Sequence, residues 1–228
     1  MSRYFAILMK TPGSPACHLI PLGHADPVVA APLADAGLTP YHAIKLILPH
    51  LARGGASVLV IGLGGLGQIG VQILRALTGA TIYATDMKPE AVALAQTRGA
   101  IGIPEGADQA EFIRNATDGR GVDAVVDFVG ASPTITLAKS VIAQGGRIQI
   151  VGIAGGTVEW SFFATPYESV MTNTYWGSIA DLHEVVAMYR AGQITPDVQT
   201  YTMDEALTAY ELLRDGKLSA RAVVTPNA

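Results

Sequence analysis

Three glycines and one aspartate stand at a spacing that could do chemistry. Gly62, Gly64 and Gly67 form G-x-G-x-x-G, and Asp86 follows 24 residues after the first glycine. The first glycine permits a tight turn, the second lets the backbone approach a pyrophosphate, and the third lets a helix pack on a strand. An acid at this distance accepts hydrogen bonds from an adenosine ribose. Because it repels a 2′-phosphate, the pattern predicts NAD rather than NADP, although Lys88 nearby weakens that discrimination.

The residues around the glycines must then form a strand, a turn and a helix. Val58 to Gly62 is short, apolar and β-branched, as a buried strand is, and Gln68 to Leu77 has apolar residues at helical spacing. Ala80 to Asp86 predicts the next strand. A glycine turn without a ligand and the similar loop of some methyltransferases are the alternatives, and Asp86 favours the dinucleotide over both. The glycines also make this run a poor membrane span.

Further strands and helices alternate along the chain. Helices are predicted from Pro89, over Ala110 to Ala116 and from Ser132 to Ala143, and strands over Val122 to Val129 and Gly145 to Ile153. Such alternation predicts an α/β fold with a doubly wound parallel sheet.

The two ends of the chain are less regular. Five prolines before residue 33 exclude a long helix there, and Tyr4 to Met9 predicts a short strand with no evident partner. A helix is predicted from Thr39 and Pro40 to about Gly54. The last expected elements are a piece at Thr174 to Ser178, helices at Leu182 to Ala191 and Asp204 to Arg214, and a strand at Arg221 to Thr225.

Composition narrows the functional classes. The chain has 228 residues, 50% of them hydrophobic and 15% charged, with a net charge of −4 and a pI near 5.7. This composition suits a packed core and gives no basic footprint for nucleic acid. The apolar patch near the N-terminus is too short to span a membrane and makes a poor signal peptide. With Cys17 as the only cysteine, neither an intrachain disulfide nor a cysteine-rich zinc site is expected, and we expect a cytoplasmic protein that does not bind membranes.

Five blocks in matching order give the chain a family resemblance. From about His18 to Pro226 the sequence resembles the zinc-type medium-chain alcohol dehydrogenases, particularly bacterial NAD-dependent members. The blocks are LADAGLTPY (Leu33 to Tyr41), the glycine run with Asp86, VDAVVDFVG (Val122 to Gly130), VGI (Val151 to Ile153), and the tail from Ala209-Tyr210 through Gly216 to Arg221.

The resemblance implies a role for individual residues. Asp86 would hold the ribose, Arg221 would lie near the phosphates, and Thr39, in the catalytic part, would pack against the nicotinamide. Asp35 stands where the family has its third catalytic-zinc ligand. The residues expected along the cofactor are Gly62, Gly64, Gly65, Leu66 and Gly67 in the turn, then Phe128, Val129 and Gly130, and finally Val151, Gly152 and Ile153. Two structural readings compete: Phe128 and Val151 as ordinary core, and Asp35 as a cap for the helix at Leu38.

The chain also departs from the family pattern. Members carry a catalytic domain of roughly a hundred residues ahead of this point, with further zinc ligands. Here about 34 residues precede Asp35, and Cys17, His18 and His24 lack the spacing of those ligands. One carboxylate cannot hold a catalytic zinc ion. We therefore expect a vestigial segment at 1–35, a truncated catalytic domain, an NAD-binding domain at 36–178, and a segment at 179–228 that in the family returns to the catalytic domain.

Tyr41 and Lys45 spell Y-x-x-x-K, the catalytic pair of short-chain dehydrogenases. That family places the pair well after its glycine loop, whereas here it comes before the loop. We therefore expect a structural role for both residues.

Two functions remain open at this point. One is hydride transfer between NAD and an alcohol or ketone, and the other is non-catalytic NAD(H) binding. Without the catalytic domain on which this segment packs in the family, apolar residues of Leu182 to Tyr189 and Ala206 to Leu213 should be exposed. Such exposure favours a homodimer or higher oligomer. A strand at Asn173 to Ser178, near Tyr175 and Trp176, resembles the family's subunit-pairing edge and is the expected contact.

Overall fold

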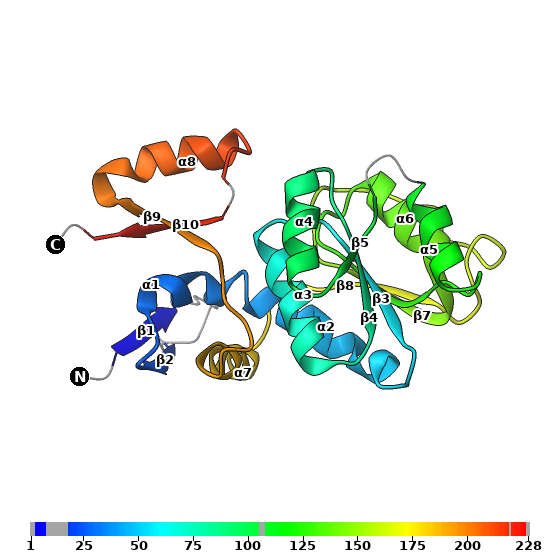
Figure 1. Ribbon diagram of the computed structural model, residues 1–228, viewed down its shortest axis with the longest axis horizontal. Helices are drawn as coiled ribbons and strands as arrows, with labels where there is room; N and C mark the ends of the chain where they lie inside the picture. Colours follow the sequence, from blue (N-terminus) through cyan, green and yellow to red (C-terminus); the bar gives the residue numbers. More distant parts are fainter. Residues whose placement is uncertain (1–2, 8–17, 105–107, 219, 227–228) are drawn as a thin grey trace.

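The structure is a computed structural model that describes residues 3–7, 18–104, 108–218 and 220–226. It has two parts (Figure 1). The larger part is a sheet with helices on both faces. The smaller part gathers both ends of the described chain, so that segments far apart in sequence lie side by side.

The larger part contains a six-stranded parallel sheet in the order β5-β4-β3-β6-β7-β8. Its strands are β3 (Ser57–Ile61), β4 (Thr81–Thr85), β5 (Ile101–Gly102), β6 (Val122–Asp127), β7 (Ile142–Ile150) and β8 (Val170–Asn173). The chain order reverses between β3 and β6, which pair directly. The predicted doubly wound parallel sheet is therefore confirmed.

Helices cover both faces of this sheet. Helices α2 (Leu38–Leu51), α3 (Gly65–Leu77) and α4 (Pro89–Thr97) pack on one face, in the cluster that contains Val58, Val60 and Val126. Helices α5 (Gln109–Ala116) and α6 (Ser132–Val141) pack on the other face with Leu59 and Val125. Burial on both faces explains why these strands are apolar at successive positions.

The smaller part begins with an antiparallel pair, β1 (Arg3–Ile7) and β2 (His18–Gly23). The short helices α1 (Pro27–Ala30) and η1 (Ala31–Ala34) follow. Helix α7 (Ile179–Arg190) packs between this segment and α2. The chain then forms β9 (Val198–Thr202), η2 (Met203–Glu205), α8 (Ala206–Arg214) and β10 (Arg221–Thr225), with β9 and β10 paired in parallel.

Several expected boundaries were wrong. The strand predicted at Asn173 to Ser178 lies earlier, because β8 ends at Asn173 and Trp176 has a φ of 51°, which extended backbone does not adopt. Strand β7 begins at Ile142, before Gly145, so the preceding helix ends at Val141 rather than Ala143. The expected strand at Tyr4 to Met9 has its described part at Arg3–Ile7, and β2 supplies the partner that the sequence did not reveal. Strand β9 was also missed.

Within the described residues, every helix is too short or too polar to cross a lipid bilayer.

Candidate functional site

The glycine turn joins β3 to α3 at the carboxyl edge of the sheet. Gly62 has a φ of +84°, which only glycine adopts without strain, and a Cβ on Gly67 would lie 1.9 Å from the Gly62 carbonyl oxygen. These two glycines are therefore needed by the fold itself. A Cβ on Gly64 would meet nothing within 4 Å. Helix α3 begins after Gly64 without a side-chain cap, so its first N–H groups and its dipole can serve an anion.

Asp86 lies at the end of β4, next to this turn. Its carboxylate accepts hydrogen bonds from the backbone N–H of Leu63 at 2.6 Å and of Lys88 at 2.9 Å. Each carboxylate oxygen has two lone pairs, so capacity for ribose hydroxyls remains. The turn thus orients the acid that the sequence placed beside it.

The turns after β6 and β7 lie against each other. Asp127, which is fully buried, accepts hydrogen bonds from the N–H groups of Val129 and Gly130 and so fixes the first turn. A Cβ on Gly130 would lie 2.1 Å from the Gly152 carbonyl oxygen, so the two backbones touch. Beyond this contact, the side chain of Ile153 is 90% exposed.

The aromatic ring of Phe128 packs against the start of α3. A Cβ on Gly70 would lie 3.0 Å from the Phe128 Cζ, and Val151 is buried with the cluster around β3. Both side chains therefore contribute to core packing, and Phe128 also lines a cleft described below.

Two adjoining clefts lie along this edge of the sheet. The first, about 530 Å³, is lined by Gly62, Gly64, Gly65, Leu66, Gly67, Asp86, Phe128, Val129, Ile153 and Ala154. The second, about 600 Å³, is lined by Leu63, Gly64, Gly65, Gln68, Ile69, Asp86, Lys88, Glu90, Ala91, Leu94, Asp197, Gly216, Lys217, Leu218, Ala220 and Arg221. They share Gly64, Gly65 and Asp86, so one extended ligand can occupy both. The structure brings together most residues that the sequence had assigned to a cofactor.

Arg221 reaches this site from the first residue of β10. A Cβ on Gly65 would lie 2.4 Å from the Arg221 Cδ, so the arginine side chain lies directly on the glycine turn. Its Nη2 forms an ion pair with the Asp35 Oδ2 at 2.9 Å. The guanidinium therefore stands between the start of α3 and the C-cap of η1.

Asp35 and Thr39 do not form a metal site with other groups. The Asp35 carboxylate contacts Arg221 and, at 3.4 Å, the Thr39 hydroxyl, which is largely buried. Throughout the described ranges, no three His, Cys, Asp or Glu side chains gather as metal ligands. His24 is exposed, while Cys17 and the side chain of His18 lie outside those ranges. Catalytic zinc takes three protein ligands, so the residues present do not fit a zinc ion and no chemical step is assigned to one.

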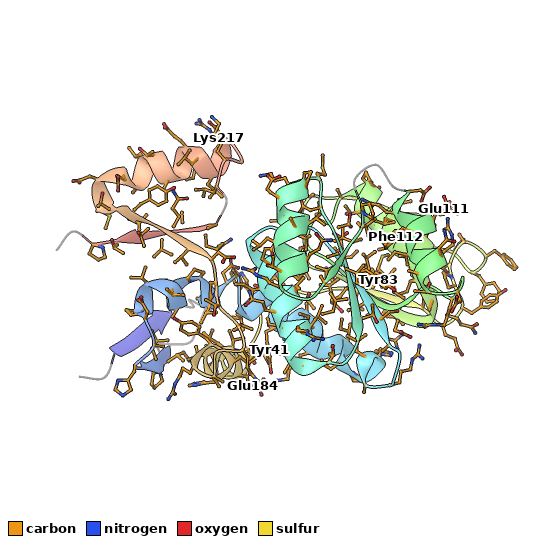
Figure 2. All side chains as sticks on the ribbon, viewed as in Figure 1. Tyr41, Tyr83, Glu111, Phe112, Glu184 and Lys217 are labelled. Atoms are coloured by element: carbon orange, nitrogen blue, oxygen red, sulfur yellow. The ribbon has the colours of Figure 1, made fainter. Side chains whose placement is uncertain are left out.

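Tyr41 and Lys45 belong to a contact between α2 and α7. The Tyr41 hydroxyl donates to Glu184 Oε2 at 2.7 Å, and the two side chains meet where α7 packs on the larger part (Figure 2). Burial, with the hydrogen bond and negative charge of Glu184, raises the pKa of Tyr41 to about 12. A catalytic tyrosine needs a pKa nearer the working pH. The pair therefore has the structural role expected from its position.

Sequence reasoning assigned Arg221 to this site but missed the residues that accompany it from the end of the chain. Lys88 Nζ donates to the Gly216 carbonyl at 2.9 Å and so ties the β4–α4 turn to the turn before β10. Lys217 projects from that same turn (Figure 2). Arg98 pairs with Asp197 on the segment leading into β9. Because β9 was not predicted, no local signal could place Asp197 here.

The comparisons with known proteins agree with this architecture. The sequence profile described as zinc-binding dehydrogenase matches residues 65–191. The D-arabinose 1-dehydrogenase (NADP(+)) of Saccharolobus solfataricus and the NAD-dependent alcohol dehydrogenase of Sulfolobus acidocaldarius are each 33% identical over 91% of this chain and 60% of their own length. The crystal structure of the alcohol dehydrogenase from Aeropyrum pernix superposes with a TM-score of 0.82 at 34% identity, covering 91% of this chain and 62% of that one.

These findings place the chain in a family. It belongs to the zinc-binding dehydrogenases, as the resemblance of its five sequence blocks implied. The chain spans about 60% of the length of the curated relatives it matches.

Proposed function

We propose that this chain binds NAD(H) as the coenzyme-binding part of an oxidoreductase that transfers hydride between the nicotinamide and an alcohol or ketone. The observation that carries the proposal is the continuous edge formed by the glycine turn, Asp86 and Arg221 along two adjoining clefts. An uncapped helix start and a guanidinium suit a pyrophosphate, and the carboxylate suits a ribose. The names of the relatives support the same chemistry.

The proposed preference for NAD over NADP rests on Asp86. Its carboxylate is held by two backbone N–H groups in the orientation described above, where a 2′-phosphate would meet negative charge. Lys88, the nearest cation on that turn, is engaged by the Gly216 carbonyl. One relative is named for NADP(+), and the affinities of the two cofactors test the preference directly. The dissociation constant of NADH should be at least 10-fold lower than that of NADPH, and the reverse order would contradict the assignment.

Gly64 offers a test that separates binding from folding. Its φ of −70° and ψ of −161° suit any residue, and its Cβ position is open. Gly64→Val should therefore leave the thermal midpoint nearly unchanged while it removes NADH binding, measured by fluorescence titration. Gly79→Val is the matched control, because Gly79 also has open space around it and lies at the opposite end of β4. Retained binding in Gly64→Val would place the cofactor elsewhere.

Non-catalytic NAD(H) binding is the second candidate function. Two observations favour it. The Asp35 carboxylate is paired with Arg221, and among the described residues no group of metal-binding side chains surrounds Asp35. The two functions differ in turnover. NADH formation from a panel of secondary alcohols and sugars, with and without added zinc, would support the enzyme, whereas NADH binding without turnover would support the binding module.

We also propose that the chain self-associates through the β8 edge of the sheet and works in the cytoplasm. Among the described strands β8 is the last of the sheet, with β7 as its neighbour. The aromatic side chains of Phe162, Phe163 and Tyr167 are exposed in the segment before it. Contiguous exposed apolar groups are unusual on monomers. Sedimentation at micromolar concentration should give a dimer or larger species, and a monomer would contradict this proposal.

A further inference from the structure

Arg221 stands between two places where it can meet negative charge, and it cannot serve both at once. One is the Asp35 carboxylate, which receives its Nη2 at 2.9 Å. The other is the position at the start of α3, where the arginine stem lies on Gly65 and the neighbouring Gly64 is bare. Both sites lie within the reach of one guanidinium.

The ion pair between Arg221 and Asp35 is exposed enough to be broken easily. The Arg221 side chain is 36% exposed and that of Asp35 is 50% exposed, so neither is locked in a dry core. Ion pairs at this level of exposure contribute only modestly to stability. Asp35 also keeps a second partner, because the Thr39 hydroxyl lies 3.4 Å from its other carboxylate oxygen. Release of Arg221 therefore does not leave the carboxylate without a donor.

A dinucleotide brings a stronger partner to the same arginine. A pyrophosphate at the start of α3 carries two charges and can take two parallel N–H bonds from a guanidinium, the geometry that arginine forms best with phosphate. Because Arg221 lines the same cleft as Gly64 and Gly65, a modest shift of its tip brings it to that anion.

We propose that Asp35 and the pyrophosphate of a dinucleotide exchange on Arg221. In the form described here Asp35 holds the arginine beside the cleft, and cofactor binding transfers it to the phosphates and releases the Asp35 carboxylate. Asp35 is thus a positioning residue. It holds Arg221 away from the pyrophosphate position in the empty site and so lowers the affinity of the chain for the dinucleotide. This inference rests on the proposed function.

The exchange is tested by the dissociation constant of NADH, measured by fluorescence titration at low salt. Asp35→Asn should tighten NADH binding about 2- to 5-fold, the range of an exposed ion pair. Arg221→Gln should weaken it, and adding Asp35→Asn to Arg221→Gln should give no further gain. Asp204→Asn removes an equal charge from η2, outside the cleft lining, and should leave the constant unchanged. Thermal midpoints of all variants show whether each remains folded.

Two smaller ligands, ADP and adenosine, show whether the pyrophosphate is the part of the cofactor that exchanges with Asp35. ADP, which carries the pyrophosphate, should show the gain in Asp35→Asn, and adenosine, which lacks it, should not. An equal gain for adenosine would show that Asp35 changes the cleft without regard to the pyrophosphate. An equal gain on the Arg221→Gln background would show that Asp35 acts through its own charge and not through the arginine. Either result would overturn the exchange. Unchanged NADH affinity in Asp35→Asn would overturn it as well. If wild-type chain binds neither NADH nor NADPH, the proposed function itself fails; NADH binding without the gain refutes only the exchange.

Discussion

Helices α7 and α8 begin in the same way and end up in different surroundings. Each follows a capping box, in which Ser178 and Asp181 exchange hydrogen bonds at α7 and Thr202 and Glu205 do so at η2, just before α8. The capping box satisfies backbone donors locally in both cases. Their difference must therefore come from what packs against them.

Helix α7 is part of the main core. Leu182, Val185 and Val186 are buried in the same cluster as the β3 side chains. The Asp181 carboxylate also accepts hydrogen bonds from the His42 and Lys45 side chains of α2. The expectation that apolar residues of Leu182 to Tyr189 would be exposed was wrong for these side chains, because β2, η1 and α2 cover them.

Helix α8 has little cover beyond its own two strands. Leu207, Tyr210 and Leu213 are 78%, 65% and 60% exposed, so the expected exposure of Ala206 to Leu213 is confirmed for these residues. The comparison shows that amphipathic sequence predicts a helix and an apolar face, but not whether another element meets that face.

The same leucine-to-alanine substitution, made on each helix, should give the largest difference between buried α7 and exposed α8. Leu182→Ala should lower the free energy of unfolding by about 3 kcal/mol, because it opens a cavity in a packed core. Leu207→Ala, on α8, should change it by less than about 0.5 kcal/mol. Urea denaturation measures both. Similar losses in the two variants would show that α8 is covered in solution.

The capping acids give the next largest contrast. Asp181, whose side chain is 6% exposed, accepts from the Ser178 N–H and Oγ, from Lys45 and from His42. Asp181→Asn places an amide among these donors and should cost about 2 kcal/mol of unfolding free energy. Glu205→Gln should barely move the thermal midpoint, because Glu205 is exposed and, among the described residues, its hydrogen bonds are to Thr202. Equal effects would mean that the contacts with α2 contribute nothing.

The smallest expected effect is a dependence on pH. Burial opposes ionisation of Asp181, but hydrogen bonds from Ser178, Lys45 and His42 outweigh it and lower its pKa. A depressed carboxyl pKa contributes stability above the unfolded value of about 3.9 that is lost as pH falls below it. Between pH 5 and pH 3, wild type should lose about 1 kcal/mol more than Asp181→Asn. Parallel pH profiles of the two proteins would contradict this assignment.

Local sequence determined the larger part of the molecule. The run from Val58 to Gly67 specifies a buried strand, a turn that needs glycine and a helix start, because each step depends on residues a few positions apart. Asp86 could be placed for the same reason, since it directly follows β4, the strand that pairs beside β3. Boundaries failed where such signals were weak, as at β7 and β8.

Only the tertiary structure decided the remainder. The strand pairs β1–β2 and β9–β10, the burial of α7 and the exposure of α8 depend on which segments meet in space, which no local pattern encodes. The clearest case is the ion pair of Asp35 with Arg221, which are 186 residues apart. The sequence suggested a separate role for each residue, but an ion pair depends on the distance between two charges. That distance is set by the packing of η1 and β10 beside the glycine turn.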